Sequence, residues 1–372
     1  MPLDTFVPPT VDANAMTLDA HWYTSADVFQ QEQERLFGRD WICVGHESNI
    51  EQPGDYFTTV VANESIIVVR DGSGAVRALY NVCRHRGTQL CPEASGHLVG
   101  SIQCPYHAWT YALDGALLAA RNMQGIEGFD RADYPLHKVA VEVVGGFIFI
   151  SLLKEPEALS SPLAPLAEKL ARWDAAGLRE AQRIDYEVAS NWKLLFQNYS
   201  ECYHCPVIHP QLEKLSSSDS GRNDFLRGAI LGGYSELRQP DGSLTTTGRR
   251  QRPPLGSVDG PDLDRDYYYT IFPSLLLSLH ADYLMVHYVR PIAADRSHVT
   301  CSWLFDPKTM EASGFDPSDA VEFWDLTNRQ DWQVNELTQR GMASRAYRPG
   351  PYANAEGLLH AFDLHYLEAM GA

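Results

Sequence analysis

The sequence is poor in positive charge and in long apolar runs. Its 372 residues include 30 lysines and arginines against 48 aspartates and glutamates, a formal net charge of −18 at pH 7. A surface this acidic repels nucleic-acid phosphates and anionic lipid headgroups, so neither nucleic acid nor a membrane is an expected partner. The apolar runs are of strand length and too short to span a bilayer.

The first residues also lack the basic and apolar segments of a secretory leader, which predicts a soluble, cytoplasmic protein. Seven cysteines are an odd number in such a chain, and this argues against a disulfide framework and for metal ligands or buried thiols. The 44% of hydrophobic residues suffice for a packed core. The length favours two domains, and no internal repeat is found.

Three segments with different patterns follow one another. Residues 1–40 predict a helical segment that ends near Gly38, and we expect it to pack on the C-terminal domain. Residues 41–153 predict an all-β domain whose turns include Asp71-Gly72-Ser73-Gly74 and Asp114-Gly115. Residues 154–372 predict an α+β domain.

The α+β domain has five expected strands and two long expected helices. The strands are expected at 182–188, 267–271, 275–279, 283–289 and 299–305, and the helices at about 192–205 and 316–341. Residues 215–262 are rich in Ser, Gly, Asp and Pro, which predicts long surface loops.

Two turns of the β domain each carry one cysteine and one histidine. Cys83 stands two residues before His85, and Cys104 stands three residues before His107. Two such loops can face one another, and their donor set suits either zinc or a Rieske [2Fe–2S] cluster, in which two histidines replace two cysteines on one iron. Zinc sites with this donor set usually pair cysteine with cysteine and histidine with histidine along the chain. The mixed pairs therefore favour the cluster.

A second group of ligand-type residues follows the helix predicted at 192–205. His204 and His209 can take two adjacent positions on one metal, with Pro206 expected to stop the helix between them. A carboxylate would complete the 2-His-1-carboxylate triad of non-haem Fe(II) oxygenases. The predicted C-terminal helix offers four carboxylates, and spacing does not choose among Glu322, Asp325, Asp331 and Glu336.

Cys202 and Cys205 allow another interpretation of this segment. Together with His204 and His209 they could form a zinc knuckle. A Rieske cluster upstream needs a redox partner, however, and zinc has no redox role. The iron interpretation is therefore favoured, and the two cysteines are expected to be buried thiols that pack the helix.

In its two cysteine–histidine motifs, C-R-H-R-G and C-P-Y-H-A-W, the chain resembles the large (alpha) subunits of Rieske non-haem iron oxygenases. The resemblance implies that Cys83 and Cys104 hold one iron of the cluster while His85 and His107 hold the other. It also implies an all-β Rieske domain followed by a catalytic domain in which a helix lies over an antiparallel sheet, as in helix-grip folds.

The resemblance implies a mononuclear Fe(II) held by His204, His209 and Asp331. Asp331 is chosen because the closing motif of the family places an aspartate ten residues before the glycine of a Gln-Arg-Gly triplet, here Gly341. Glu201 would bridge His204 to a cluster histidine of a neighbouring subunit, in a homotrimer or a multiple of it. Glutamate at this position resembles the carnitine, choline and glycine betaine branch.

Glu201 and Asn198 share one face of the helix predicted at 192–205, and both are candidate catalytic residues. The implied activity is that of a terminal oxygenase that uses O2. Its electrons would come from NAD(P)H through a separate flavin and iron–sulfur reductase, because no G-x-G-x-x-G fingerprint follows a strand here. They would pass through a cluster histidine, Glu201 and His204.

The expected substrate is a small organic molecule, bound among aromatic side chains of the second half. Tyr268 belongs to this aromatic supply, and the residues expected to line the pocket are Tyr267, Tyr269, Phe272, Tyr283 and His287. Aromatic faces hold a quaternary ammonium group by cation–π attraction, which favours N-demethylation or hydroxylation of a betaine-like compound. They also stack on aromatic rings, so ring hydroxylation or O-demethylation of an aromatic acid is the alternative. A Rieske electron carrier would need only the β domain.

Overall fold

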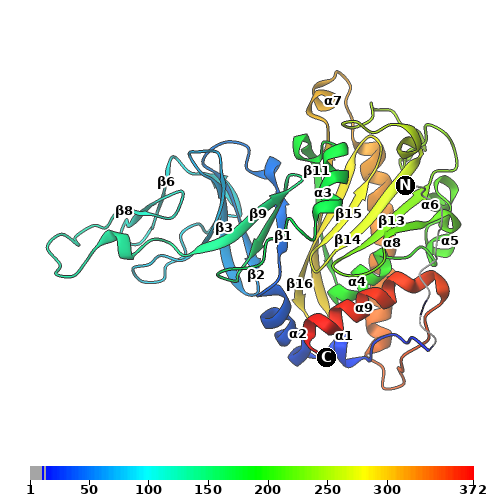
Figure 1. Cartoon of the computed structure of the whole chain (residues 1–372), viewed down its shortest axis with the longest axis horizontal. Helices are drawn as coiled ribbons and strands as arrows, with labels where there is room; N and C mark the ends of the chain where they lie inside the picture. The colour runs from blue at the N-terminus through cyan, green and yellow to red at the C-terminus, as the bar shows by residue number, and fades with distance from the viewer. Residues whose placement is uncertain (1–10, 12–13) are drawn as a thin grey trace. The chain divides into compact units, whose positions relative to one another are not determined.

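The chain forms two compact units in the computed structural model, which describes residue 11 and residues 14–372 (Figure 1). Unit 1 comprises the described residues up to Glu32 together with Pro162–Ala372, and unit 2 comprises Gln33–Ser161. The chain therefore begins unit 1, builds unit 2 and returns to unit 1. These limits fall at 32/33 and 161/162, whereas the sequence predicted changes after residues 40 and 153.

Unit 2 is built from antiparallel strands. A seven-stranded sheet has the order β1-β10-β9-β4-β3-β2-β5, and a three-stranded sheet has the order β6-β7-β8. The bounds are β1 Ile42–His46, β2 Asp55–Val61, β3 Glu64–Arg70, β4 Val76–Tyr80, β5 Ser95–His97, β6 Ser101–Gln103, β7 Thr110–Ala112, β8 Leu117–Ala119, β9 Lys138–Val144 and β10 Phe147–Ser151. The predicted hairpins are confirmed as β3–β4 and β7–β8.

The carboxylate of Asp71 organises the turn between β3 and β4. Its Oδ1 accepts hydrogen bonds from the amides of Ser73 and Ala75 at 2.8 and 3.1 Å. Its Oδ2 accepts one from Arg77 Nε at 2.7 Å. Burial raises the pKa of Asp71, but these donors outweigh burial and lower it to about 2.

Unit 1 is a seven-stranded antiparallel sheet with helices on its faces. The strand order is β11-β17-β16-β15-β14-β13-β12. The bounds are β11 Arg179–Val188, β12 Arg222–Phe225, β13 Ile230–Glu236, β14 Arg265–Ile271, β15 Leu275–Leu279, β16 Leu284–Ala293 and β17 Arg296–Phe305. The five predicted strands are confirmed, and the expectation of loops throughout 215–262 is wrong because β12 and β13 lie there.

A glycine pair explains why β13 was missed. A Cβ at Gly232 would lie 1.9 Å from the carbonyl oxygen of Tyr268, and one at Gly233 would lie 1.9 Å from that of Arg222. Both neighbouring backbones therefore approach β13 closely, and only glycine fits. When the neighbouring strands are unknown, a glycine pair in a polar stretch predicts a loop.

The helices of the chain are mostly short. Their bounds are α1 His21–Thr24, α2 Ala26–Glu32, α3 Ala164–Arg172, α4 Trp192–Tyr199, α5 Cys205–Ile208, α6 Pro210–Leu215, α7 Pro307–Glu311, α8 Ser318–Met342 and α9 Gly357–Met370, with a π-helical turn at Gln33–Phe37. The long helix predicted at 316–341 is confirmed as α8, which Figure 1 shows running along the sheet. None of the described helices is long and apolar enough to cross a membrane.

The helix predicted at 192–205 is shorter than expected. It ends at Tyr199, where the hydroxyl of Ser200 donates to the carbonyl of Phe196 at 2.6 Å. Pro206 does not stop a helix but stands in the first turn of α5, a position that proline tolerates because its missing N–H has no partner there. Asn198 therefore lies on α4, whereas Glu201, which was expected on the same helical face, lies in the loop that follows.

Helices α4 and α8 cover one face of the sheet, and α3 covers the other. Tyr199 of α4 contacts Ser278 of β15 through their hydroxyls, 2.6 Å apart. Lys169 of α3 donates to the hydroxyl of Tyr269 on β14 at 2.7 Å. Side chains alternate along a strand, so residues two apart on β14 or β16 share a face.

A buried ion pair joins the two ends of unit 1. Lys193 of α4 and Glu32 of α2 form a salt bridge in which both side chains are fully buried. The Tyr366 hydroxyl of α9 donates to the same carboxylate at 2.7 Å. Helices α2 and α9, from opposite ends of the described chain, thus meet on α4.

Candidate functional site

The two loops with the paired ligands have equivalent backbones. In each loop the cysteine carbonyl accepts a hydrogen bond from the amide four residues later, Gly87 for Cys83 at 3.0 Å and Ala108 for Cys104 at 3.1 Å. Gly87 and Ala108 both have positive φ, +73° and +58°. The same tight turn therefore presents its cysteine and histidine twice.

The side chains of these loops fit an iron–sulfur cluster. The thiols of Cys83 and Cys104 are free and buried. The rings of His85 and His107 are 4.8 Å apart, and the buried Nδ1 of His107 has no hydrogen-bond partner among the described residues. Two buried thiols and two neighbouring imidazoles are the donors that a Rieske cluster requires.

The surroundings of these loops favour a neutral imidazole at His107 and place a hydroxyl beside the Cys83 thiol. Burial, His85 and Arg86 lower the pKa of His107. The Tyr111 hydroxyl lies 3.3 Å from Cys83 Sγ. A neutral imidazole is the form that binds metal.

Three further side chains converge within unit 1. His204 Nε2, His209 Nε2 and Asp331 Oδ1 lie 3.2, 3.3 and 2.8 Å apart in the pairs His204–His209, His204–Asp331 and His209–Asp331. Ligand atoms at adjacent octahedral corners are about 3 Å apart when metal–ligand bonds are about 2.1 Å. The set is a candidate metal site that leaves other coordination positions open.

The electrostatics of this site favour a cation among the three residues. Burial lowers the pKa of His204, but hydrogen bonds with Asp331 and Glu201 outweigh it and raise the pKa to about 10. Burial raises the pKa of Asp331, and the two histidines outweigh it and lower this pKa. The donor set therefore fits a divalent metal ion, which would take the place of the proton.

Two side chains outside the triad fix which imidazole nitrogen faces it. His204 Nδ1 is 2.6 Å from Glu201 Oε1, and His209 Nδ1 is 2.8 Å from Gln330 Oε1. An acceptor at each Nδ1 holds the proton there and leaves Nε2 free for a metal. Gln330 was not anticipated, although it stands directly before Asp331.

Glu201 and Asn198 both lie beside His204, although they are not on one helix. Glu201 Oε2 also accepts the amides of Tyr203 and His204. Asn198 Nδ2 is 3.4 Å from His204 Nε2, and its Oδ1 accepts from Asn335 Nδ2 at 3.3 Å.

Cys202 and Cys205 are joined by a disulfide, so the expectation of two buried free thiols is wrong. Cys202 is only partly buried, because the helix that was expected to cover it ends before it. The bonded sulfurs are not free to bind zinc, which removes the knuckle interpretation.

Two of the five expected pocket residues lie on the face of the sheet opposite to α4 and α8. Tyr267 and Tyr269 face α3, where the ammonium of Lys169 lies 3.7 Å from the ring centre of Tyr267. Both tyrosine rings contact a cation, but this cation is the Lys169 ammonium of the chain itself and not a substrate. Tyr268 between them faces α4 and α8, with ring contacts to Tyr199 and Trp324.

The other three expected residues are on the α4 and α8 side. Phe272 packs on Trp192 and Phe362 in the core. The hydroxyl of Tyr283 donates to the carbonyl of Leu244 and accepts from Trp324 Nε1, so Tyr283 is also part of the packed core. His287 is buried between Tyr199 of α4 and Asn328 of α8.

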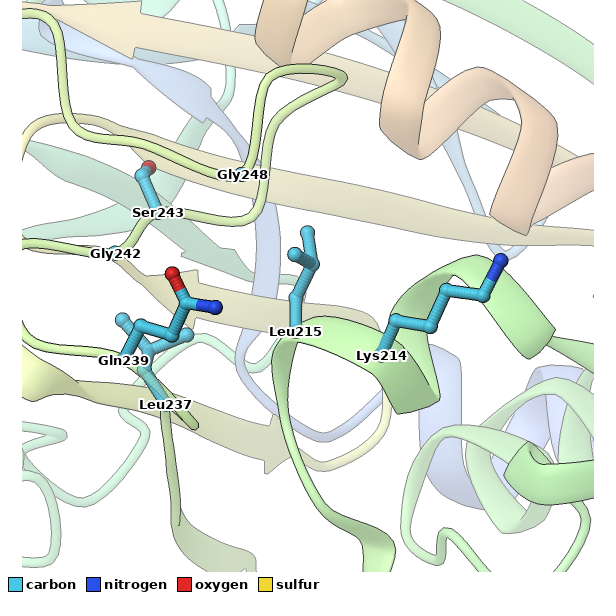
Figure 2. A pocket seen from close by; sticks show the side chains of 7 residues that line it. All are labelled: Lys214, Leu215, Leu237, Gln239, Gly242, Ser243 and Gly248. Atoms are coloured by element: carbon cyan, nitrogen blue, oxygen red, sulfur yellow. The ribbon is translucent and has the colours of Figure 1, made fainter.

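A small hollow lies elsewhere in unit 1, between α6 and the loop that runs from Leu237 to Gly248 (Figure 2). Its polar side chains include Gln239 and Ser243. The Ser243 hydroxyl already donates a hydrogen bond to Asp282, at 3.0 Å. None of the predicted ligands lines this hollow.

Comparison with known families identifies the chain. Residues 40–130 match the family described as Rieske [2Fe-2S] domain, and residues 175–372 match the family described as ring hydroxylating alpha subunit (catalytic domain). The chain is a Rieske oxygenase alpha subunit. The predicted fold, the terminal oxygenase activity and the two cofactors, a Rieske cluster and a mononuclear iron, are thereby confirmed.

The similarity of this Rieske oxygenase to its relatives extends over nearly its full length. It is 32% identical to the glycine betaine monooxygenase oxygenase subunit of Pseudomonas aeruginosa, over 91% of this chain and 85% of that protein. It is 32% identical to the carnitine monooxygenase oxygenase subunit of Acinetobacter baumannii, over 90% and 87%. The solved quaternary ammonium Rieske monooxygenase CntA with gamma-butyrobetaine superposes with a TM-score of 0.80 at 29% identity, over 98% and 99%.

Proposed function

We propose that this Rieske oxygenase oxidises a small quaternary ammonium compound of the betaine type, by N-demethylation or hydroxylation. Relatives named for glycine betaine and carnitine support this substrate class, because their similarity covers nine-tenths of the chain. The observation that carries the proposal is the glutamate at position 201, whose carboxylate lies 2.6 Å from His204 Nδ1. Glutamate at this position is typical of the quaternary ammonium branch.

We further propose the ligands of each centre. Cys83, Cys104, His85 and His107 would hold the cluster, and His204, His209 and Asp331 would hold the mononuclear iron. When bound, the two centres supply single electrons and O2 activation.

The residues around the triad would orient its ligands. Glu201 keeps the proton of His204 on Nδ1, and Gln330 does the same for His209, so both Nε2 lone pairs point inward. Asn198, held by Asn335, would position His204 from its other side.

Glu201 is also proposed to contact a neighbouring subunit in a homotrimer. Two exposed apolar side chains near it, Tyr203 and Val207, support a covered surface here, with 66% and 82% of their area exposed in the single chain. The trimer would receive electrons from a separate flavin and iron–sulfur reductase in the cytoplasm, and ultimately from NAD(P)H.

The test is a single turnover with pooled candidates. Protein with both centres filled is chemically reduced and mixed with O2 and glycine betaine, proline betaine, carnitine, choline and several aromatic acids, and the products are identified by mass. Loss of a methylene unit with formaldehyde, or gain of one oxygen by a quaternary ammonium compound, is the expected result. Consumption of only an aromatic acid would overturn the proposed substrate class.

A further inference from the structure

A disulfide encloses one of the proposed iron ligands. Cys202 and Cys205 are bonded to each other, whereas the other five cysteines of the chain are free and buried. A bond between residues three apart closes a ring of four residues, and His204 is one of the two residues inside it. The covalent bond therefore acts directly on the backbone that carries a ligand of the mononuclear centre.

The ring also carries the hydrogen bonds that orient His204. Glu201 stands directly before the ring, and its carboxylate accepts the amides of Tyr203 and His204, which lie inside it. The same carboxylate lies 2.6 Å from His204 Nδ1. After the ring, the amides of Val207 and Ile208 both donate to the His204 carbonyl at 3.0 Å. A change in the conformation of the ring would thus move both His204 and its acceptor.

The ring lies in a loop between two helices. Helix α4 ends at Tyr199 and α5 begins at Cys205. The Cys205 amide donates to the Cys202 carbonyl at 3.2 Å, and the disulfide joins the same two residues. A covalent cross-link restricts a loop more strongly than one backbone hydrogen bond does, so the disulfide is the stronger of these two constraints.

One sulfur of the pair can be reached from outside. Cys202 is only partly buried, whereas Cys205 is 3% exposed. Thiol–disulfide exchange begins when a thiolate attacks an accessible sulfur, which here is that of Cys202. Cys202 adjoins Tyr203, part of the surface proposed above to be covered in a trimer, so we expect a small thiol and not a protein as the reagent. In a reducing compartment such as the proposed cytoplasm, disulfides are usually transient, catalytic or redox-sensing.

We propose that Cys202–Cys205 is a redox-sensitive modification site that controls how tightly the mononuclear iron is held. In the disulfide form the ring keeps His204 beside His209 and Asp331, and the iron is retained. In the dithiol form the loop is freer, and the iron exchanges more quickly. This inference rests on the ligand set proposed above.

The chemistry of the switch is an exchange of two electrons and two protons. Two molecules of a small thiol reduce the pair: they become one disulfide, and both protein sulfurs become thiols. A peroxide reverses the change, because the two thiols give up two electrons and two protons and the peroxide is reduced to two molecules of water.

The experiment follows the release of the mononuclear iron in the two forms. Protein with both centres filled is treated with a phosphine, which reduces disulfides without being a thiol ligand, and the phosphine is removed before an Fe(II) chelator is added. The rate of iron uptake by the chelator is compared for the disulfide form, the dithiol form and C202S/C205S. Alkylation and mass analysis of the peptide with both cysteines identify the form, and the electron paramagnetic resonance spectrum of the reduced cluster shows that the cluster is intact.

We expect the dithiol form and C202S/C205S to release this iron at the same rate, on the order of tenfold faster than the disulfide form, as closing a four-residue ring implies. A peroxide should restore the slow rate in the wild type and leave C202S/C205S unchanged. C43S should keep the full response to phosphine and peroxide, because Cys43 lies on β1 of unit 2. Equal rates in all forms, or a disulfide that the phosphine does not reduce in the folded protein, would overturn the inference.

Folding and the ligand set are controlled separately. C202S opens the same ring but leaves the buried Cys205 in place, so it carries the test if C202S/C205S does not fold. A wild type that binds no mononuclear iron in either form would show the proposed ligand set itself to be wrong. A wild type that binds this iron but releases it at one rate in both forms would leave that set intact and refute only the role of the disulfide.

Discussion

The two candidate metal centres of this Rieske oxygenase are assembled in different ways. The loops around Cys83 and Cys104 lie close together in the sequence and repeat one backbone turn, and His85 is exposed. The triad joins His204 and His209 to Asp331 of α8, from a distant part of the chain. One centre is therefore a product of local turns, and the other exists only when α8 has packed on the sheet.

The difference has a consequence for mutations. A change in a turn of unit 2 is expected to act locally, because backbone hydrogen bonds within each loop set the ligands. A change in the triad or its support acts on side chains that are distant in the sequence and that meet only through the packing of α8. The following predictions test this contrast, from the largest effect to the smallest.

D331A should remove the mononuclear iron and leave the cluster. The iron content should fall from about three to about two atoms per chain, and turnover should be undetectable, because two histidines alone make a weak site. Iron analysis and the electron paramagnetic resonance spectrum of the reduced cluster measure this. D325A on the same helix should keep all the iron, since Asp325 pairs with Tyr186 and Arg329 instead. An unchanged iron content in D331A would exclude Asp331 as a ligand.

E201Q should leave both centres filled but lower turnover by about 100-fold, because the negative charge at His204 Nδ1 is lost. Turnover rates and metal analysis together measure this. E213Q is a matched control, since Glu213 of α6 pairs with Arg238 and not with a triad residue. Wild-type turnover in E201Q would refute the bridge.

Q330L should weaken iron binding by about 10- to 100-fold, because His209 loses the acceptor that fixes its ring. The rate at which a chelator removes the mononuclear iron measures this. Gln211 donates to Gln330 and Thr327, so Q211L removes a bond to Gln330 and should have a smaller effect. Equal rates in Q330L and the wild type would show that the orientation of His209 is set elsewhere.

D71N should destabilise unit 2 by about 1–2 kcal/mol at neutral pH. The folded-state pKa of Asp71 is lowered to about 2, below that of the unfolded chain, so its contribution is present above about pH 4 and is lost as the pH falls toward 2. Unfolding of wild type and D71N at about pH 7 and pH 3 measures the difference, which should narrow in acid. A difference independent of pH would mean that the ionised carboxylate is not the cause.

The sequence was sufficient where neighbours along the chain decide the structure. The hairpins at Asp71 and Asp114 were predicted because two strands and their turn are local. The cysteine–histidine pairs were recognisable for the same reason. The choice of Asp331 over three other carboxylates needed the family motif, because helical spacing is satisfied by several residues at once.

The differences between prediction and structure have separate physical origins. A strand sequence does not reveal which of its faces will be covered by which helix. Three consecutive tyrosines on β14 allow two assignments, and the prediction chose Tyr267 and Tyr269, whereas Tyr268 faces α4 and α8. The helix expected through Glu201 failed because the hydroxyl of Ser200 and the carboxylate of Glu201 compete with the helix for backbone partners.

The buried bond between Lys193 and Glu32 implies an order of events during synthesis. Glu32 leaves the ribosome early, but its cation arrives only after all of unit 2 has been made, and the Tyr366 hydroxyl arrives close to the end of the described chain. By then all the strands of unit 2 and its four proposed cluster-binding residues have been synthesised. We therefore expect the electron-transfer unit to fold first, while the oxygen-activating unit waits for its final helix.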